Sequence, residues 1–329
     1  MAANVADFRG PLEAERFAGG QSNPTFRLTT PGERYVLRRK PMGALLKSAH
    51  AVDREYRVMH ALHGIGFPVP RMRALCLDDA VIGSAFYVMD HVEGRLFWDP
   101  TLPELPHGER AQVYDAMNAV LARLHLVDPG AIGLADFGRP GNYFARQIDR
   151  WTKQYRASET EALPAMDHLI EWLPAHIPPD ERTESAIVHG DFRLDNIIFH
   201  PTAPRVLAVI DWELSTLGHP LGDFAYLLMS WRLDPATFRG LLGADLAALG
   251  IPDEAAYVAS YCARTGRAGI AHLDYYLAYN MFRLAAILQG IAKRALDGTA
   301  SSQDAHETGA RARRVAEAGL RQMERAARR

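Results

Sequence analysis

The chain has 329 residues, of which 48% are hydrophobic and 23% charged, so it can bury a sizeable core as an ordinary globular protein of one or two domains. Its formal net charge of −2 argues against dependence on nucleic acid, because surfaces that follow phosphates are usually strongly basic. Neither an apolar stretch of about eighteen residues nor a basic start followed by an apolar run is present, so we expect no membrane span and no secretion. Two cysteines, Cys76 and Cys262, are too few for a disulfide framework, and we expect buried, reduced thiols in a cytoplasmic protein.

The N-terminal part predicts a small sheet that begins with a hairpin. Strand-like runs at 26–28 and 35–38 flank a turn. A glycine-rich turn precedes them, where a loop could fold over nucleotide phosphates. Gly20 would allow close backbone approach, and Ser22 and Asn23 could meet anionic oxygens. A plain hairpin turn would look similar. No G-x-x-x-x-G-K-[ST] motif occurs, which disfavours a P-loop NTPase.

A cation and an acid follow on the next strand and helix. Apolar residues recur at helical spacing over 49–63, and Glu55 is the acid in this helix that faces the right way to reach a strand cation. We expect it to pair with Arg38, whose guanidinium can grip phosphate oxygens with two parallel donors. Lys40, two residues further on the same strand face, is the competing candidate. A surface arginine is the plain alternative for Arg38.

The run 85–89 predicts another strand, and 90–94 predicts the connection to the rest of the chain. In a kinase, adenine would bond to backbone groups around Met89 to Val92, which leaves little side-chain signature.

The stretch from Val188 to Asn196, V-H-G-D-F-R-L-D-N, spaces its polar residues as phosphoryl transfer requires. In protein kinases the catalytic aspartate and a metal-binding asparagine are five residues apart, as Asp191 and Asn196 are here. Asp191 would orient or deprotonate the attacking hydroxyl. Arg193 would neutralise the transferred phosphate.

A second acid follows a predicted hairpin formed by the runs 197–199 and 206–210. The hairpin would return Asp211 beside Asn196, so that both could bind Mg²⁺. The plain alternative makes His189 a packed core histidine and Asp211 a loop cap.

Only eleven residues separate Asp211 from Asp223, which leaves no room for the long activation loop of a protein kinase and disfavours a protein substrate. In related kinases an equivalent acid braces the catalytic loop, so we expect Asp223, at the start of a helix, to support that loop, and we place His189 with it outside the reacting groups. A helix cap is its plain alternative.

The C-terminal part predicts helices over 224–231, 273–294 and 311–329. Arg283 lies inside an apolar helical run and therefore needs a partner. It is a candidate acceptor contact, and an internal ion pair is an equally good explanation. The basic amphipathic helix at 311–329 could meet an anionic partner, although a solvated face explains it more simply.

Together these motifs resemble the aminoglycoside phosphotransferase and choline kinase superfamily, whose members carry H-G-D-x4-N and a following I-D-W-E. The similarity extends over nearly the whole chain. One branch is matched in particular, namely the kinase domain fused to acyl-CoA dehydrogenases and the kinase of bacterial levulinate breakdown. The residues that carry this likeness lie at 19–26, 35–41, 87–89 and 94–98.

The resemblance implies a protein-kinase-like α/β (α+β) fold with two lobes. Residues 1–92 would form a nucleotide-binding lobe with a small sheet and one helix, and residues 93–329 a mostly helical catalytic and substrate-binding lobe. It implies ATP and Mg²⁺ as cofactors and a small-molecule hydroxyl as acceptor, with no prediction of oligomeric state. Choline kinases also carry arginine at the position of Arg38.

The implied acceptor of that branch is a 4-hydroxyacyl-CoA thioester. An aminoglycoside, choline or another small alcohol is the alternative, and a nucleotide-binding pseudokinase scaffold is the alternative of another class. From Phe224 to Arg329 there are fourteen Lys and Arg residues against ten Asp and Glu, a balance of +4. Because aminoglycosides are polycations, this balance favours an anionic or acyl-CoA acceptor.

Overall fold

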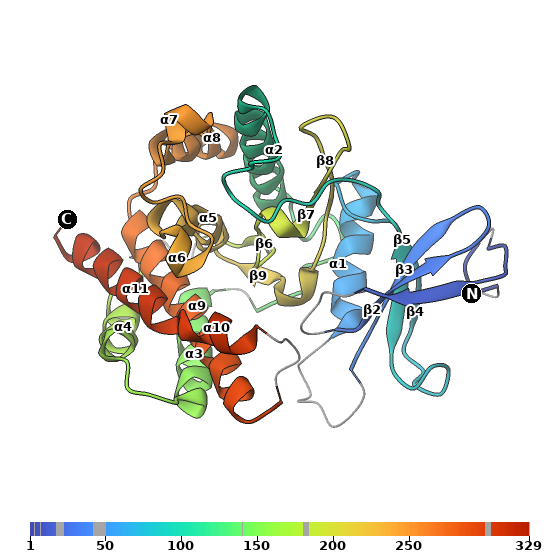
Figure 1. The fold of residues 1–329 in the computed structure, drawn as a ribbon, viewed down its shortest axis with the longest axis horizontal. Helices are drawn as coiled ribbons and strands as arrows, with labels where there is room; N and C mark the ends of the chain where they lie inside the picture. Colours follow the sequence, from blue (N-terminus) through green and yellow to red (C-terminus); the bar gives the residue numbers. More distant parts are fainter. Residues whose placement is uncertain are drawn as a thin grey trace. The chain divides into compact units, whose positions relative to one another are not determined.

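The computed structural model describes most of the chain, namely residues 1–2, 4–6, 8–17, 23–41, 51–139, 141–179, 184–299 and 304–328. Contacts between Cα atoms divide it into two compact units. Unit 1 contains residues 1–96, 128–137 and 195–215, and unit 2 contains residues 97–127, 138–194 and 216–329. The first unit therefore takes two short segments from the middle of the chain, which Figure 1 distinguishes by their colours.

Unit 1 is built on a five-stranded antiparallel sheet with the order β1-β2-β3-β5-β4. The strands are β1 (Glu13–Arg16), β2 (Thr25–Thr29), β3 (Arg34–Arg39), β4 (Met72–Cys76) and β5 (Phe86–Asp90). Strands β2 and β3 form the hairpin that the sequence predicted, with Thr25 opposite Arg38. This register fixes which side chains of β3 share one face of the sheet.

The helix α1 (Val52–Gly64) lies beside this sheet and contacts β4 and β5 (Figure 1). Its buried face consists of residues at helical spacing, namely Val52, Glu55, Val58, Met59 and Leu62. Glu55 is the one charged member of this face. A carboxylate at such a position requires partners inside the unit.

A second hairpin in unit 1 is formed by β7 (Ile197–Phe199) and β8 (Val206–Val209). It begins directly after the 3₁₀ turn η2 (Leu194–Asn196) and leads into η3 (Trp212–Leu214). The Ile210 N–H donates to the Asn196 carbonyl at 2.9 Å. The predicted return of the chain to Asn196 is thereby confirmed.

Unit 2 is mostly helical and is organised around α9 (Leu273–Leu296), which is buried on nearly all sides between residues 274 and 290. The helices that pack against α9 are α3 (Tyr143–Ser158), α4 (Pro164–Ala175), α5 (Pro220–Leu228), α10 (Ala305–Ala310) and α11 (Ala312–Ala327) (Figure 1). The basic helix predicted at the C-terminus is therefore α11, and its apolar face is covered by α9 and α4. Among its charges, Arg313 pairs with Glu161.

The remaining elements of unit 2 are short, apart from the long α2 (His107–His125) and α8 (Glu254–Thr265), which pack together. A two-stranded sheet joins β6 (Ala186–Val188) to β9 (Thr216–Gly218). The sequence H-G-D starts where β6 ends, and α5 starts shortly after β9. The pairing of β6 with β9 therefore brings the H-G-D segment close to the start of α5.

Two further sequence expectations can be compared with the structure. Among the described residues, no helix is both long enough and apolar enough to cross a lipid bilayer. Both cysteines are free, but only Cys262 is buried, whereas Cys76 is partly exposed because it ends the edge strand β4.

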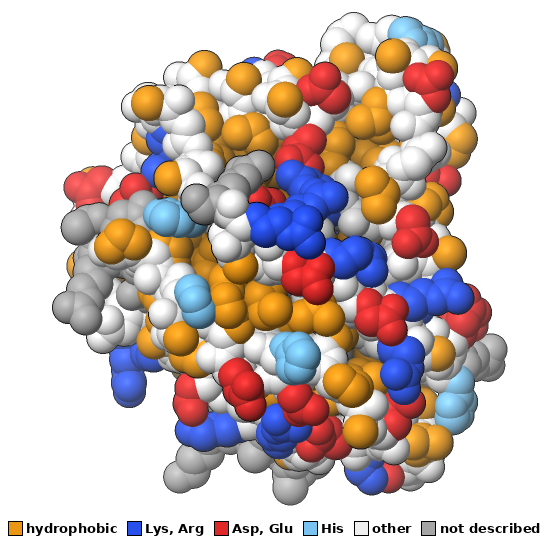
Figure 2. Space-filling model, turned by 90° about the vertical axis from the view of Figure 1, so that its left-hand side faces the viewer, with side chains coloured by type: hydrophobic (Ala, Val, Ile, Leu, Met, Phe, Trp, Pro, Cys, Tyr) orange, Lys and Arg blue, Asp and Glu red, His pale blue; other side chains and the backbone are white. Residues whose placement is uncertain are grey.

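On the face of the molecule drawn in Figure 2, acidic and basic side chains are interspersed, and one group of Lys and Arg side chains lies near the middle beside hydrophobic ones.

Candidate active site

The loop after β6 is held by one buried carboxylate. The N–H groups of His189 and Gly190 donate to Asp223 Oδ2 and Oδ1 at 2.7 and 2.8 Å. Gly190 has φ = 82°, a conformation that glycine adopts without strain, which explains the glycine in H-G-D. Asp223 therefore makes the bracing contact expected from the sequence. It is not the N-cap of α5, because that position belongs to His219, whose side chain accepts from the Leu221 N–H.

Asp223 is 3% exposed, so its charge needs stabilisation inside the protein. Burial opposes ionisation, but the hydrogen bond and charge of His125 and the contacts from His189 outweigh it, so that the pKa of Asp223 lies below its ordinary value. His125 Nε2 lies 3.3 Å from Asp223 Oδ2. The loop thus rests on a carboxylate that stays ionised at neutral pH.

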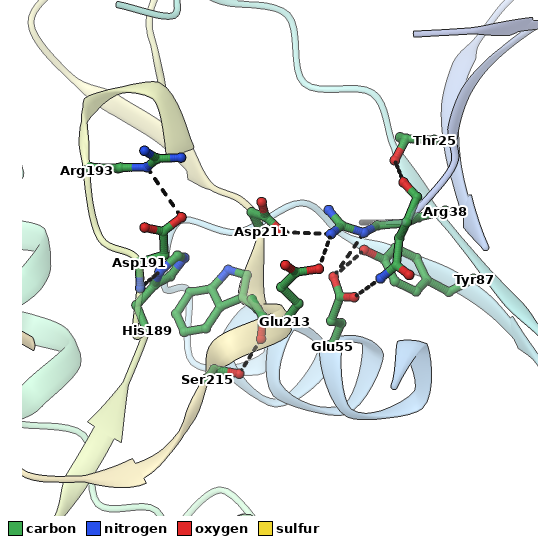
Figure 3. A network of polar contacts seen from close by, with 12 residues as sticks. Thr25, Arg38, Glu55, Tyr87, His189, Asp191, Arg193, Asp211, Glu213 and Ser215 are labelled. Atoms are coloured by element: carbon green, nitrogen blue, oxygen red, sulfur yellow. Dashed lines mark hydrogen bonds and ion pairs between the residues drawn. The ribbon is translucent and has the colours of Figure 1, made fainter. Parts of the chain in front are cut away.

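Asp191 lies in this loop with both carboxylate oxygens engaged. The Tyr226 hydroxyl donates to Oδ1 at 2.5 Å, and Arg193 Nε lies 3.3 Å from Oδ2 (Figure 3 shows the Arg193 contact). The Asp191 N–H faces His189 Nδ1 at 3.2 Å. The structure therefore brings together Asp191, Arg193 and His189 in unit 2, as the motif predicted.

Arg283 is buried beside the same loop. It is 5% exposed, and its Nη2 donates to the Gly190 carbonyl at 2.5 Å. Its guanidinium carbon lies 5.2 Å from the Tyr226 ring centroid and 5.5 Å from that of Trp151. The partners are thus a backbone carbonyl and two aromatic rings, which can stabilise a buried guanidinium without a carboxylate.

A second group of polar residues lies in unit 1 around Arg38, whose side chain is 12% exposed. Arg38 Nη2 donates to Asp211 Oδ1 at 2.7 Å and to Glu213 Oε2 at 3.0 Å (Figure 3). Arg38 Nε lies 3.4 Å from Glu55 Oε2. The pairing of Arg38 with Glu55 that the sequence predicted is present, and two acids of the segment after β8 join it.

Glu55 is fully buried and has two neutral donors besides Arg38. Asn23 Nδ2 donates to Oε1 at 3.0 Å, and the Tyr87 hydroxyl donates to Oε2 at 3.1 Å. Burial raises the pKa of Glu55 to about 7, Arg38 opposes this shift, and Asp211 and Glu213 add to it. Asn23, which was expected in a phosphate-binding loop, is 2% exposed and donates a hydrogen bond to Glu55 in this structure.

Carboxylates predominate in the described part of the cluster around Arg38. Three of them, those of Glu55, Asp211 and Glu213, lie within ion-pair distance of its guanidinium. Asp211 has φ = 66° and ψ = 60°, a left-handed conformation that few residues other than glycine, asparagine and aspartate adopt. Its side chain remains 31% exposed. A partly exposed carboxylate beside other carboxyl groups is suited to bind a cation.

The other residues predicted to bind nucleotide lie partly outside this cluster. Gly20 and Ser22 fall outside the described residues. Met89 lies in the sheet between Val36 and Met72, whereas Val92 follows the end of β5. The Lys40 N–H donates to the Ala85 carbonyl just past the end of β3.

Four residues of these two groups were not assigned a role from the sequence, namely Glu213, Tyr87, Tyr226 and His125. Glu213 carried a signal, since it is a second acid two residues after Asp211. The other three lie on strands or helices whose apolar pattern explains them equally well, so periodicity alone could not separate them from core residues.

Comparisons with known proteins agree with this geometry. The model of the phosphotransferase enzyme family matches residues 13–259. A crystal structure of an aminoglycoside phosphotransferase-like protein from Ralstonia eutropha JMP134 has 57% sequence identity and a TM-score of 0.90, and the match covers 99% of this chain and 96% of that one. Choline kinase from Cryptosporidium parvum has a TM-score of 0.65 at 12% identity, with 98% and 93% covered, which shows a shared kinase-like fold.

Longer curated relatives are also similar to this chain. Acyl-CoA dehydrogenase family member 10 from Mus musculus is 49% identical over 303 residues, which cover 91% of this chain and 28% of the mouse protein. Acyl-CoA dehydrogenase family member 11 from Gallus gallus is 45% identical over 317 residues, covering 94% of this chain and 40% of that protein. The chain thus spans less than half the length of these relatives.

Proposed function

The chain belongs to the phosphotransferase enzyme family, and we propose that it uses ATP to phosphorylate the hydroxyl group of an acyl-CoA thioester of the 4-hydroxyacyl class. The observation that carries this proposal is the 49% identity with a longer protein named for acyl-CoA dehydrogenases. We expect a kinase segment within such a protein to act on a substrate that also carries CoA.

The balance of charge supports this class of acceptor. Residues 224–329 carry fourteen Lys and Arg against ten Asp and Glu. A site specialised for a polycationic aminoglycoside would be expected to carry the opposite excess. The aminoglycoside class remains the second candidate, because the 57% identical crystal structure is named for it.

In the proposed reaction, Asp191 accepts the proton of the acceptor hydroxyl while the hydroxyl oxygen bonds to the γ-phosphorus of ATP and the bond to the β,γ-bridging oxygen breaks. Arg193, paired with Asp191 at 3.3 Å, would stabilise the charge on the transferred phosphoryl group. Arg38, held by Glu55, would bind the α- and β-phosphates. Val92, with Met89 before it, would lie at the adenine.

Mg²⁺ fits the residues of unit 1. Among the described residues, three carboxyl groups lie around the Arg38 guanidinium, and Asp211 is partly exposed within this cluster. Asp211 and Asn196 would hold the ion. Their backbones lie close together, because the N–H of Ile210, the residue before Asp211, donates to the Asn196 carbonyl. Nucleotide phosphates would complete the oxygen ligands of the ion. When bound, Mg²⁺ would neutralise charge on the β- and γ-phosphates.

A coupled ATPase assay with purified protein tests the acceptor. The panel contains 4-hydroxyvaleryl-CoA, free 4-hydroxyvalerate, kanamycin and choline, each with and without Mg²⁺, and Asp191→Ala protein serves as the background. We expect turnover to rise with the thioester and to require Mg²⁺. A response to kanamycin or choline, with none to the thioester, would refute the acceptor assignment and leave the kinase activity standing. Magnesium-dependent ATP binding without turnover on any acceptor would support the scaffold alternative.

A further inference from the structure

The carboxylate of Asp191 has a fixed orientation because it is held from both sides within unit 2. The Tyr226 hydroxyl donates to Oδ1 at 2.5 Å, and Arg193 Nε lies 3.3 Å from Oδ2. Oδ2 is thus the oxygen on the side of Arg193, whose side chain is 30% exposed. Oδ1 lies on the side of the buried Tyr226.

Tyr226 can act as a permanent donor to Asp191. It lies on α5 and is 7% exposed. Burial, followed by the negative charge of Asp191, raises the pKa of Tyr226 above its ordinary value of 10.0. The phenol therefore keeps its proton throughout the pH range in which a kinase works, and it always donates to the carboxylate.

Arg283 holds both Tyr226 and the residue before Asp191. Its guanidinium carbon lies 5.2 Å from the Tyr226 ring centroid, and its Nη2 donates to the Gly190 carbonyl at 2.5 Å. Its Nε is buried and has no hydrogen-bond partner among the described residues. A guanidinium that is 5% exposed and already turned towards the loop is better suited to hold the loop than to meet a substrate.

We propose that Tyr226 and Arg283 are positioning residues for phosphoryl transfer. Tyr226 fixes the rotation of the Asp191 carboxylate so that Oδ2 meets the acceptor hydroxyl, and Arg283 fixes the Tyr226 ring and the Gly190 carbonyl. This inference rests on the proposed role of Asp191 as the acceptor of the hydroxyl proton. A carboxylate that turns freely would spend part of its time with neither oxygen aligned, which lowers kcat without weakening substrate binding.

The test is Tyr226→Phe, which removes the hydroxyl and keeps the ring against Arg283. We expect kcat to fall about 10- to 100-fold, a part of what a general base contributes, while the KM values for ATP and acceptor stay within about twofold.

Tyr114→Phe is the matched control. Tyr114 on α2 is 1% exposed, and its hydroxyl donates to the Pro100 carbonyl at 2.6 Å, so this variant also loses one buried tyrosine hydrogen bond but none to Asp191. It should lose stability comparably and keep the wild-type kcat and KM values. Equal kinetics for Tyr226→Phe and Tyr114→Phe would overturn the proposal.

A second variant, Arg283→Met, tests the other half of the proposal. Loss of the contact with the Gly190 carbonyl should speed amide hydrogen exchange in residues 189–193 and lower kcat, with the acceptor KM unchanged. A rise in acceptor KM at constant kcat would instead make Arg283 a substrate contact. If Asp191→Ala retains turnover, the proposed function itself fails, and that result is distinguishable from wild-type kinetics of Tyr226→Phe alone.

Discussion

Arg38 Nη2 lies 2.7 Å from Asp211 Oδ1, so the proposed phosphate-binding cation and the proposed metal ligand neutralise each other within unit 1. Two residues 173 positions apart in the chain thus share one ion pair, which Glu213 extends at 3.0 Å. When Mg²⁺ and nucleotide bind, Asp211 would contact the metal and Arg38 the phosphates in place of this ion pair. The acids keep Arg38 in place until then.

The first prediction concerns the two aspartates with proposed roles in the reaction. Asp191→Ala and Asp211→Ala should each lower kcat by about 10³-fold or more, because both carboxylates act on charge that develops during transfer. Steady-state kinetics with the acceptor identified in the screen provide the measurement, and circular dichroism monitors the fold. Asp53→Ala, which removes an exposed acid from the first turn of α1, should leave kcat unchanged. Near-wild-type turnover of either active-site variant would exclude this mechanism.

The second prediction separates Arg38 from its competitor Lys40. Arg38→Ala should raise the KM for ATP and lower kcat, and Arg38→Lys should keep partial activity because the charge remains without the two parallel donors. Arg34→Ala is the control, since Arg34 lies on the same strand and makes an exposed pair with Glu93. Its effect should be small, as for most exposed ion pairs. A larger defect in Lys40→Ala than in Arg38→Ala would assign the phosphate contact to Lys40.

The sequence predicted those parts of the structure that follow a local pattern. The hairpin of β2 and β3, the helix α1 and the chain return at Ile210 all follow from strand or helix periodicity and turn residues. The pair of Arg38 and Glu55 was accessible because helical spacing places Glu55 among the apolar residues of α1, and Arg38 lies on a strand of the neighbouring sheet.

Contacts that depend on tertiary packing could not be predicted in this way. The hydroxyl of Tyr226 meets Asp191 only because β6, β9 and α5 fold together, and nothing in the apolar sequence of α5 distinguishes this tyrosine. Asn23 was assigned to a phosphate-binding loop, but it is buried against Glu55, since a buried carboxylate requires nearby donors. The left-handed conformation of Asp211 is similarly set by its surroundings.

The third prediction uses the raised pKa of Glu55, about 7 against an ordinary value of 4.5. Between these two values the folded protein holds a proton that the unfolded chain has lost, so the contribution of Glu55 to stability falls as pH rises from about 4.5 to 7 and is constant above. Glu55→Gln removes this titration. Relative to that variant, the wild-type free energy of unfolding should drop by on the order of 3 kcal/mol between pH 5 and pH 8. Denaturant unfolding at several pH values provides the measurement, and parallel curves for the two proteins would contradict the burial of an ionisable Glu55.

The last prediction concerns Asp223, the carboxylate beneath the catalytic loop. Asp223→Asn keeps the shape but replaces one acceptor oxygen by a donor, so either the His189 or the Gly190 N–H loses its partner, and the contact with His125 loses its charge. A buried donor left without a partner costs about 1 to 3 kcal/mol, and we expect destabilisation in this range together with a lower kcat, because Asp191 follows directly in the loop. The control is Asp245→Asn, at the exposed N-cap of α7 (Leu246–Leu249), where the aspartate accepts from the Ala248 N–H. Asparagine caps helices about as well as aspartate, so this variant should change stability by less than about 0.5 kcal/mol. Thermal unfolding and kcat measured on both variants decide the matter: if Asp223→Asn is as stable and as active as Asp245→Asn, the loop does not depend on the carboxylate beneath it.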